Sequence, residues 1–263
     1  MNKVQVVSWM RERQIAKVVI DNPPVNVINA DVIEQLTLVI EEIENDPEIK
    51  VVIFTGKGEK AFIAGGDIKG FPEWMGKGVE EAKKKSLWLQ QPLNKIDCLS
   101  RPTIAAINGV ALGGGCELAL CCDIRIAEEQ IRIGLPEIKL GLFPGAGGTQ
   151  RLPRLVGKAK AKEMIFTGES LSAEEAKQIG LVNHVVPRGQ SLGKALEIAE
   201  SICRFSLPAL SFAKQSINTG CDQPLYEGLV TEAEYFGHVF QTVDIKEGVE
   251  AFIQKREPKF IDK

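Results

Sequence analysis

Long apolar runs and histidines are scarce in this sequence of 263 residues, and each shortage argues against a class of protein. No window approaches the roughly 18 consecutive apolar residues of a membrane-spanning helix, so we expect no membrane segment. Residues 1–14 carry positive charges at positions 3, 11 and 13 and lack an apolar stretch of signal-peptide length. The two histidines, His184 and His238, adjoin no recognisable nucleophile motif, which argues against a serine hydrolase.

The sequence also lacks an excess of charge of either sign. Its formal net charge is −3, which gives no electrostatic reason to expect a nucleic-acid or membrane partner. The one basic run, Lys83–Lys85, follows Glu80 and Glu81 and is typical of a solvated helix face. A local patch for a phosphorylated ligand is the alternative interpretation of this run.

Cysteines are present, six in number, but without the spacing of a zinc site. Cys121 and Cys122 are adjacent inside an apolar run, which is typical of reduced, buried thiols in a cytosolic protein. We therefore predict a cytoplasmic protein with neither a disulfide framework nor a metal site.

Continuous apolar segments alternate with helical patterns over most of the chain. Strands are expected at 4–7, 16–20, 50–56 and 102–109, and helices at 30–43 and 78–99. This alternation indicates an α/β fold with βαβ organisation. Beyond Gly157 the pattern becomes helical, with helices expected at 158–166, 172–180, 191–218, 224–239 and 246–256. We therefore divide the chain into an α/β core, residues 1–200, and a helical region, residues 201–263.

Two glycine-rich stretches follow buried strands, "AFIAGGDIKG" at 61–70 and "GVALGGGCEL" at 109–118. The second stretch matches neither the lysine-containing phosphate loop nor the spacing of a dinucleotide fingerprint. Backbone N–H groups at the start of a helix are unpaired, and glycine lets a ligand oxygen approach them closely. The two turns together are therefore a candidate site for one oxyanion, with a donor from each segment.

Two glutamates have surroundings that suit acid–base chemistry. Glu117 comes two residues after Gly115, in an expected first helical turn, and Glu137 lies in a loop crowded with glycine and proline. One carboxylate can deliver a water as a base while the other donates a proton, if burial and mutual repulsion separate their pKa values. The structural alternatives are a helix-dipole acid for Glu117 and a backbone-bonded loop acid for Glu137. Asp67 and Asp123 are expected to be capping or turn residues.

Taken together, these stretches resemble the enoyl-CoA hydratases of the crotonase superfamily. The resemblance is carried by "AFIAGGDIK", "AINGVALGGGCELALCCDIRIA", "GLPEIKLGLFPGAGGTQRLPRLVG" and "TGESLSAEEAKQIGLVNHVVP". It extends over essentially the whole chain, including the C-terminal "EGVEAFIQKREPKF". The implied fold is a crotonase-like spiral of ββα units. Its C-terminal helical region, residues 201–263 here, would build a homotrimer or a dimer of trimers.

The resemblance also implies roles for individual residues. The thioester carbonyl oxygen of an acyl-CoA substrate would be held by the backbone N–H groups of Gly66 and Gly114. Glu117 and Glu137 would hold one water for syn addition across the 2-trans double bond. In that reaction Glu117 would activate the water and Glu137 would protonate the α-carbon. Gly66 is glycine where many relatives have alanine, and since the donor is a backbone amide, the difference should matter little.

Substrate contacts follow from the same resemblance. The path of the pantetheine and thioester would be lined by residues of the first glycine stretch: Ala64, Gly66, Asp67, Ile68 and Lys69. Phe236, Phe252 and Lys255 are candidates to contact the coenzyme A nucleotide, across a subunit boundary. The alternatives are core or interface packing for the two phenylalanines and simple solvation for the lysine. Coenzyme A belongs to the substrate, so no separate cofactor is expected.

Three other functions remain as alternatives. An enoyl-CoA isomerase shifts the double bond with one principal acid, and the presence of both glutamates favours hydration. A hydratase for a branched substrate, such as a methylglutaconyl thioester, stays open because the sequence does not reveal the acyl chain. An RNA-binding protein is the non-enzyme alternative, and the even charge argues against it.

Overall fold

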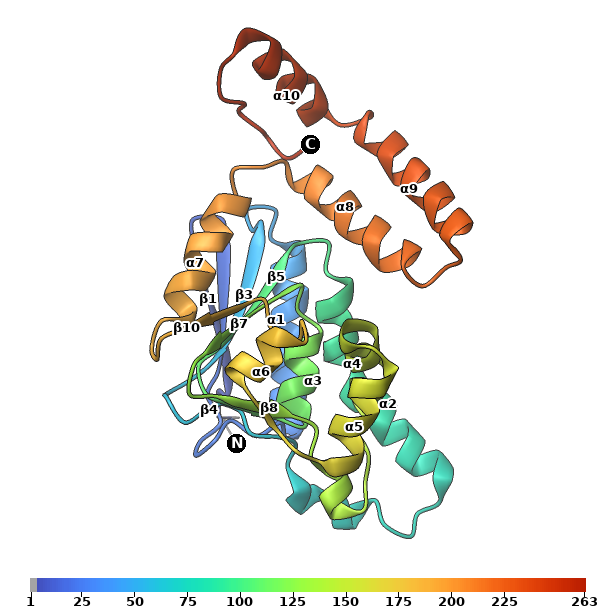
Figure 1. Cartoon of the computed structure of the whole chain (residues 1–263). Helices are drawn as coiled ribbons and strands as arrows, with labels where there is room; N and C mark the ends of the chain where they lie inside the picture. The colour runs from blue at the N-terminus through green and yellow to red at the C-terminus, as the bar shows by residue number, and fades with distance from the viewer. Residues whose placement is uncertain (1–3) are drawn as a thin grey trace.

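The computed structural model describes residues 4–263 and begins with an antiparallel hairpin at the edge of the larger of two sheets (Figure 1). Strand β1 (Val7–Glu12) pairs with β2 (Ile15–Ile20), and Arg13 turns the chain with a φ of 54°. The strand expected at 4–7 therefore lies further along the chain, and charged residues expected in the loop lie on β1. An edge strand tolerates exposed charged side chains, which explains the difference.

From β2 onward the chain winds as a spiral in which successive turns add one strand to each of the two sheets. The turns are β3 (Val51–Gly56), β4 (Ala61–Ile63) and α2 (Val79–Cys98), then β5 (Thr103–Ile107), β6 (Val110–Leu112) and α3 (Gly114–Leu120), then β7 (Ile124–Glu128) and β8 (Arg132–Gly134). With β9 (Leu171–Ser172) and β10 (His184–Val186), the strand orders are β1-β2-β3-β5-β7-β10 and β4-β6-β8-β9. The spiral of ββα turns predicted from the sequence is confirmed.

Glycines occupy corners where the chain passes from one sheet to the other. A Cβ atom on Gly56 would lie 2.3 Å from the Phe62 carbonyl oxygen, and one on Gly109 would lie 2.6 Å from the Ala61 nitrogen. Both distances are far shorter than van der Waals contact. A larger residue at either corner would force the backbones of adjoining strands apart.

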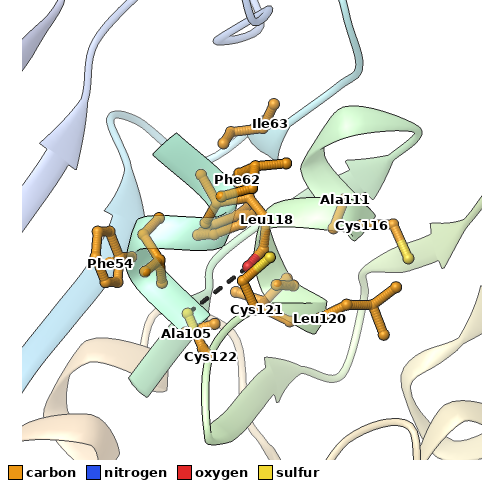
Figure 2. Close-up of a cluster of buried hydrophobic side chains, with 14 of the residues drawn as sticks. Phe54, Phe62, Ile63, Ala105, Ala111, Cys116, Leu118, Leu120, Cys121 and Cys122 are labelled. Carbon is orange, nitrogen blue, oxygen red and sulfur yellow. Dashed lines mark hydrogen bonds between the residues drawn. The ribbon is translucent and has the colours of Figure 1, made fainter. Parts of the chain in front are cut away.

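The hydrophobic core surrounds α3, the short helix that follows the second glycine stretch. Phe54 from β3 and Phe62 from β4 lie in the same cluster as the apolar residues of this helix (Figure 2). Cys121 and Cys122 are buried there as free thiols, as the sequence predicts. The Cys122 thiol donates to the Leu118 carbonyl oxygen at 3.7 Å.

Helices cover the sheets and separate the strands. They are α1 (Ala30–Asn45), α4 (Gly148–Val156), α5 (Lys158–Thr167), α6 (Ala173–Gln178) and α7 (Ser191–Ile202), with two short 3₁₀ turns, η1 (Ile68–Glu73) and η2 (Glu137–Leu140). Helix α4 was not among the predicted helices, because it begins with a glycine and contains Pro153, which weaken the helical signal.

The last three helices form an arm that extends away from the core (Figure 1). They are α8 (Leu207–Gly220), α9 (Leu225–Val239) and α10 (Val243–Gln254). Helix α9 packs against α8, and their backbones approach closely where a Cβ atom on Gly228 would lie 2.9 Å from the Gly220 carbonyl oxygen. Glycine at these positions lets the two helices form a tight hairpin.

The single helix predicted over 191–218 is wrong, because the chain turns between α7 and α8. The Ser206 side chain accepts a hydrogen bond from the Ala209 N–H and caps α8, and Pro208 lies in the first turn of that helix. A cap and a proline at this position start a new helix. We call residues 203–206 the hinge.

The arm exposes many large apolar side chains. All described residues of α9 are at least partly exposed. The exposed apolar residues of α9, α10 and the segment between them are Leu225, Tyr226, Leu229, Val230, Phe236, Phe240, Val243, Val249, Phe252 and Ile253. An apolar surface of this extent is typical of an interaction site.

An ion pair fastens α8 to the core. The Lys214 ammonium lies 2.8 Å from Asp123 Oδ2, and the same oxygen accepts from the Thr103 N–H at 2.7 Å. Asp123 thus joins two strand ends and the arm, a wider structural role than the capping or turn residue expected from the sequence.

A second ion pair ties the C-terminal tail to the hinge. The Lys50 side chain is only 4% exposed, and its ammonium lies 2.9 Å from Asp262 Oδ2. It also donates to the carbonyl oxygens of Cys203 and Phe205, at 3.2 and 3.0 Å. Asp262 Oδ1 in turn accepts from the Leu207 N–H at 2.9 Å. The tail therefore fixes the direction in which α8 leaves the core.

Candidate active site

The three consecutive glycines at 113–115 each meet a different requirement. Gly113 has a φ of 52°, and a Cβ atom there would lie 3.1 Å from Glu137 Oε1. Gly114 is the first residue of α3, so its N–H has no intrahelical acceptor. A Cβ atom on Gly115 would lie 2.0 Å from the Ile63 carbonyl oxygen, so α3 packs directly on the β4 backbone. Left-handed backbone, an open N–H and close packing together explain the run.

The other glycine turn, Gly65–Gly66, lies beside the first. The position of a Cβ atom on Gly114 is only 3.7 Å from the Gly66 nitrogen. Ile28 holds this turn from its other side, because its N–H donates to the Gly65 carbonyl at 2.8 Å and its carbonyl accepts from the Asp67 N–H at 2.9 Å. Three chain segments therefore meet at the two glycine turns.

The N–H groups of Gly66 and Gly114 are placed to serve one ligand. Among residues 4–263 the Gly66 N–H has no acceptor, and the Gly114 N–H lies at the positive end of a helix. A Cβ atom on Gly66 would meet no atom within 4 Å, so alanine fits at this position. The structure brings the two predicted donors together, and their role toward a thioester stays a prediction.

Glu117 is anchored inside the protein by backbone donors. Its side chain is 3% exposed, and Oε1 accepts from the Ala146 and Gly148 N–H groups at 2.8 and 2.9 Å. Burial raises the pKa of Glu117, whereas these two N–H groups and the Arg151 cation lower it. Burial is the largest of these effects, so the pKa of Glu117 remains above its ordinary value, and the three groups limit that shift.

Glu137 begins η2, and its carboxyl group lies over the glycine turn at 113. Oε2 is buried and has no hydrogen-bond partner among the described residues. A Cβ atom on Gly168, at the end of α5, would lie 2.9 Å from the Ile138 side chain, so α5 fixes this turn from behind. Burial raises the pKa of Glu137 to about 7; its own backbone N–H opposes that shift and the charge of Glu117 adds to it.

The two carboxyl groups therefore have unlike surroundings. Glu117 is held by donors that favour its charge, whereas Glu137 has an unsatisfied oxygen and a pKa at which both forms exist near neutral pH. Such a pair can supply a base and a proton donor at one place, and it titrates as a coupled unit. Both acids predicted from the sequence lie at the glycine turns.

The rest of the first glycine stretch leads away from these turns. Ala64 is half-buried and its N–H donates to the Val25 carbonyl at 3.1 Å. Asp67 Oδ1 accepts from the Lys69 N–H at 3.0 Å and caps η1, so it has the turn role that the sequence predicts. Ile68 and Lys69 are exposed on that 3₁₀ turn. Their contacts with a substrate remain predictions.

Phe236, Phe252 and Lys255 lie on the arm, away from α3 (Figure 1). The two phenylalanines are 63% and 85% exposed, so the alternative that they pack in the core is wrong. Phe236 makes an edge-on contact with Phe240 at 5.2 Å between ring centres, and Lys255 ends α10 with a φ of 55°. A contact with a substrate at Glu117 would have to come from another copy of the chain.

The described part of the chain bears on three further features: metal-ligand groups, membrane-spanning helices and the two histidines. Between residues 4 and 263, no group of three or more His, Cys, Asp or Glu side chains is arranged to hold a metal ion. Over the same range, no helix combines the length and apolar character needed to cross a membrane. His184 lies on β10, and His238 stacks on Phe212 in the arm, 5.7 Å between ring centres.

Sequence reasoning missed the residues that support the site. Ile28 follows Pro23 and Pro24 along the chain, and its backbone pairs with Gly65 and Asp67 beside the first glycine turn. Ala146, Gly148 and Arg151 belong to "PGAGGTQR", in which the glycines signal a close backbone approach. What they approach is the carboxylate of Glu117.

Comparisons with known proteins identify one family to which this chain is similar. A family model described as "Enoyl-CoA hydratase/isomerase" matches residues 10–263. The chain is 44% identical over 247 residues to a short-chain-enoyl-CoA hydratase of Clostridium acetobutylicum, covering 94% of each chain. It is 40% identical over 254 residues to a crotonyl-CoA hydratase of Syntrophomonas wolfei, covering 96% of each.

A solved structure supports the fold class. The crystal structure of an enoyl-CoA hydratase from Bacillus anthracis is 40% identical and superposes with a TM-score of 0.92, covering 98% of this chain and 100% of that one. The crotonase-like fold predicted from the sequence is thereby confirmed.

Proposed function

The chain belongs to the enoyl-CoA hydratase/isomerase family, and we propose that it adds water across the double bond of short 2-trans-enoyl-CoA thioesters. One observation carries the proposal: Glu117, held by two N–H groups, and Glu137, with a pKa of about 7, meet beside the two glycine turns. Hydration needs a base and an acid at one place. Similarity to proteins named short-chain-enoyl-CoA and crotonyl-CoA hydratase favours a short acyl chain.

The N–H groups of Gly66 and Gly114 would polarise the thioester. Both would donate to its carbonyl oxygen, on which negative charge develops as the conjugated system accepts a nucleophile. This withdrawal of charge makes the β-carbon electrophilic. Ile68 and Lys69, both exposed, would line the path of the pantetheine chain together with Ala64.

Glu117 would be the base and Glu137 the acid. The water oxygen bonds to the β-carbon while Glu117 takes a proton from that water. The π electrons shift toward the α-carbon, which receives the proton of Glu137. Atoms and electrons balance without a metal or a redox cofactor, and none is proposed. After this step Glu117 carries the proton taken from water and Glu137 has lost its own. A proton must therefore return to Glu137, and Glu117 must lose its proton, before the next turnover.

An absorbance assay tests this proposal. Mixing the protein with crotonyl-CoA should reduce the ultraviolet absorbance of the conjugated thioester, and EDTA should not stop the reaction. Glu117→Gln and Glu137→Gln should each lower turnover by about 100- to 10,000-fold. If the two acids act on one water, the double variant should lose much less than the product of the single losses.

Two results would decide against the proposal. Faster conversion of a 3-enoyl thioester than hydration of a 2-enoyl thioester, with only one of the two glutamates essential, would indicate an isomerase. Unchanged absorbance across several acyl chain lengths, straight or branched, would refute hydration altogether.

We propose further that the arm assembles the chain into a homotrimer or a dimer of trimers. The exposed apolar side chains of α9 and α10 support this assembly. In the assembly Phe236, Phe252 and Lys255 would reach the coenzyme A nucleotide of a substrate bound to a neighbouring copy. Light scattering at micromolar concentration should show a trimer or hexamer, and a monodisperse monomer would contradict the proposal.

A cytoplasmic location and the absence of a nucleic-acid partner complete the proposal. Six free cysteines, three of them buried, support a reducing compartment. The net charge of −3 gives little attraction to phosphate backbones. Retention on RNA that persists at moderate salt would overturn the second statement.

A further inference from the structure

The polar face of α2 lies against the turn that holds Glu117. Ser86, Gln90, Asn94 and Asp97 recur at a spacing that places them on one side of the helix. Together with residues 143–145, Gly147 and the polar side of α4, they line a cavity of about 440 Å³. The proposed reaction gives these four side chains no role.

The turn between η2 and α4 is held on two sides. Its outer carbonyl, that of Gly145, accepts from Ser86 Oγ at 2.7 Å and from Gln90 Nε2 at 2.9 Å. The N–H groups of the next residues on the turn, Ala146 and Gly148, both donate to Glu117 Oε1. A shift of this turn away from α2 would therefore move both donors of the carboxylate.

Arg151 makes a second link between α2 and this turn. Its Nε lies 2.9 Å from Asp97 Oδ2, and its Nη2 donates to Asn94 Oδ1 at 2.7 Å. A Cβ atom on Gly147 would lie 2.1 Å from Arg151 Nη1, so the guanidinium covers the turn directly. The Arg151 side chain is only 16% exposed.

We propose that the polar face of α2, acting through the Gly145 carbonyl and Arg151, positions the carboxylate of Glu117 for water activation. This inference rests on the proposed hydratase function. Ser86, Gln90, Asn94 and Asp97 are positioning residues, because they act on the turn. Misplacing a reacting group by about 1 Å can cost about 100-fold in rate.

Arg151 also contributes to the charge state of Glu117, after burial and the Gly148 and Ala146 N–H groups. The ionisable groups near this carboxylate are Glu137 on η2, Arg151 on α4, the Cys116 thiol on α3 and the Cys121 thiol at the C-terminal cap of α3. Burial raises the pKa of both thiols far above the usual range, so they stay neutral. Arg151 is the cation that lowers the pKa of Glu117, and Asp97 pairs with it from α2.

Variants at Arg151 separate positioning from general stability. Arg151→Met should lower kcat by about 10- to 100-fold with little change in KM. It should also move the acid limb of the kcat/KM profile upward by about one pH unit, since a nearby cation favours a carboxylate. Arg151→Lys keeps the charge and should restore the limb. Arg154→Met is the matched control, because it removes an exposed ion pair with Asp222 one turn further along α4.

Variants on α2 test the link through Gly145. Ser86→Ala and Gln90→Met each leave one donor to its carbonyl, whereas the double variant leaves neither. The double variant should lose about 10- to 100-fold in kcat, and each single variant much less. Circular dichroism and melting temperature should stay near those of the wild type.

The outcomes distinguish this inference from the proposed function. Wild-type kcat and an unmoved acid limb in both Arg151→Met and the α2 double variant would overturn the inference. If Arg151→Met lost kcat while its acid limb stayed in place, and if Arg151→Lys did not recover that kcat, Arg151 would have only a structural role. Absence of hydration by the wild type would refute the proposed function instead. In that case the pKa of Glu117 can still be measured by infrared titration of its carboxyl band, which is assigned by its loss in Glu117→Gln. The inference predicts that Arg151→Met raises this pKa.

Discussion

Hydration by this protein should weaken as the pH rises above neutrality, because Glu137 then loses the proton that it has to donate. Burial and the charge of Glu117 raise the pKa of Glu137 to about 7. At that pKa the group is about nine-tenths protonated at pH 6 and about one-tenth at pH 8. A carboxyl group with an ordinary pKa of 4.5 would be only about 3% protonated at pH 6. The shift therefore decides whether a proton donor exists at neutral pH.

The acid limb of the pH profile reflects Glu117, which must be ionised to act as the base. Burial raises its pKa, and the Ala146 and Gly148 N–H groups with Arg151 oppose that shift. The active form of the pair carries one proton. The value of kcat/KM should therefore rise with pH as Glu117 loses its proton and fall as Glu137 does, giving a bell with two macroscopic pKa values.

The measurement is kcat/KM for crotonyl-CoA from about pH 5 to about pH 9 at constant ionic strength. We expect a fall of about tenfold per pH unit beyond about pH 7.5, with circular dichroism unchanged over the same range. Phosphate groups of the substrate titrate near pH 6 and so do not account for an alkaline limb. A flat profile above pH 7, or the same limb in the residual activity of Glu137→Gln, would refute the assignment of Glu137 as proton donor.

Two further predictions concern the glycines. Gly115→Ala places a Cβ atom 2.0 Å from the Ile63 carbonyl oxygen and should lower the free energy of unfolding by about 1–3 kcal/mol or more, measured with urea. Its control is Gly66→Ala, because a Cβ atom on Gly66 has no neighbouring atom within 4 Å; this variant should change neither stability nor kcat. An equal loss of stability in the two variants would contradict the packing argument. Gly114→Pro removes an N–H at the first position of α3, where a helix tolerates proline, and should lower kcat by about 100- to 1,000-fold. Gly114→Ala keeps the donor, although the Ile28 side chain must yield slightly, and a loss as large as that of Gly114→Pro would remove this N–H from the mechanism.

Hydrophobic periodicity predicts the long elements of this fold well. The spacing over 30–43 predicts one buried face, and the six residues of that face are buried in α1, whereas Leu38 on the other side is exposed. The six buried residues are Val32, Ile33, Leu36, Val39, Ile40 and Ile43. The break between α7 and α8 is not visible in periodicity, because both helices continue an apolar pattern and the chain is divided by the Ser206 cap. The boundary between α7 and α8 therefore depends on a local cap, which periodicity alone does not reveal.

For the site, the sequence predicts which residues the structure brings together better than how they are held. The two glycine turns are recognisable because a glycine run signals a close backbone approach, and the family resemblance favours an acid–base role for the two glutamates over their structural alternatives. The contact of Ile28 with the first turn depends on a long-range backbone pairing. The raised pKa of Glu137 depends on burial by segments distant in sequence. Neither follows from a local pattern.

The ion pair between Lys50 and Asp262 bears on the order of events during synthesis. It joins residues near opposite ends of the chain, so its closure carries a large entropic cost and is expected late in folding. On the ribosome, the strands and helices around α3 emerge before Asp262 exists, and that region can fold as a unit. The hinge is locked only afterwards. A nascent chain can therefore complete the pocket around Glu117 and Glu137 before its arm is set in the direction needed to meet other copies.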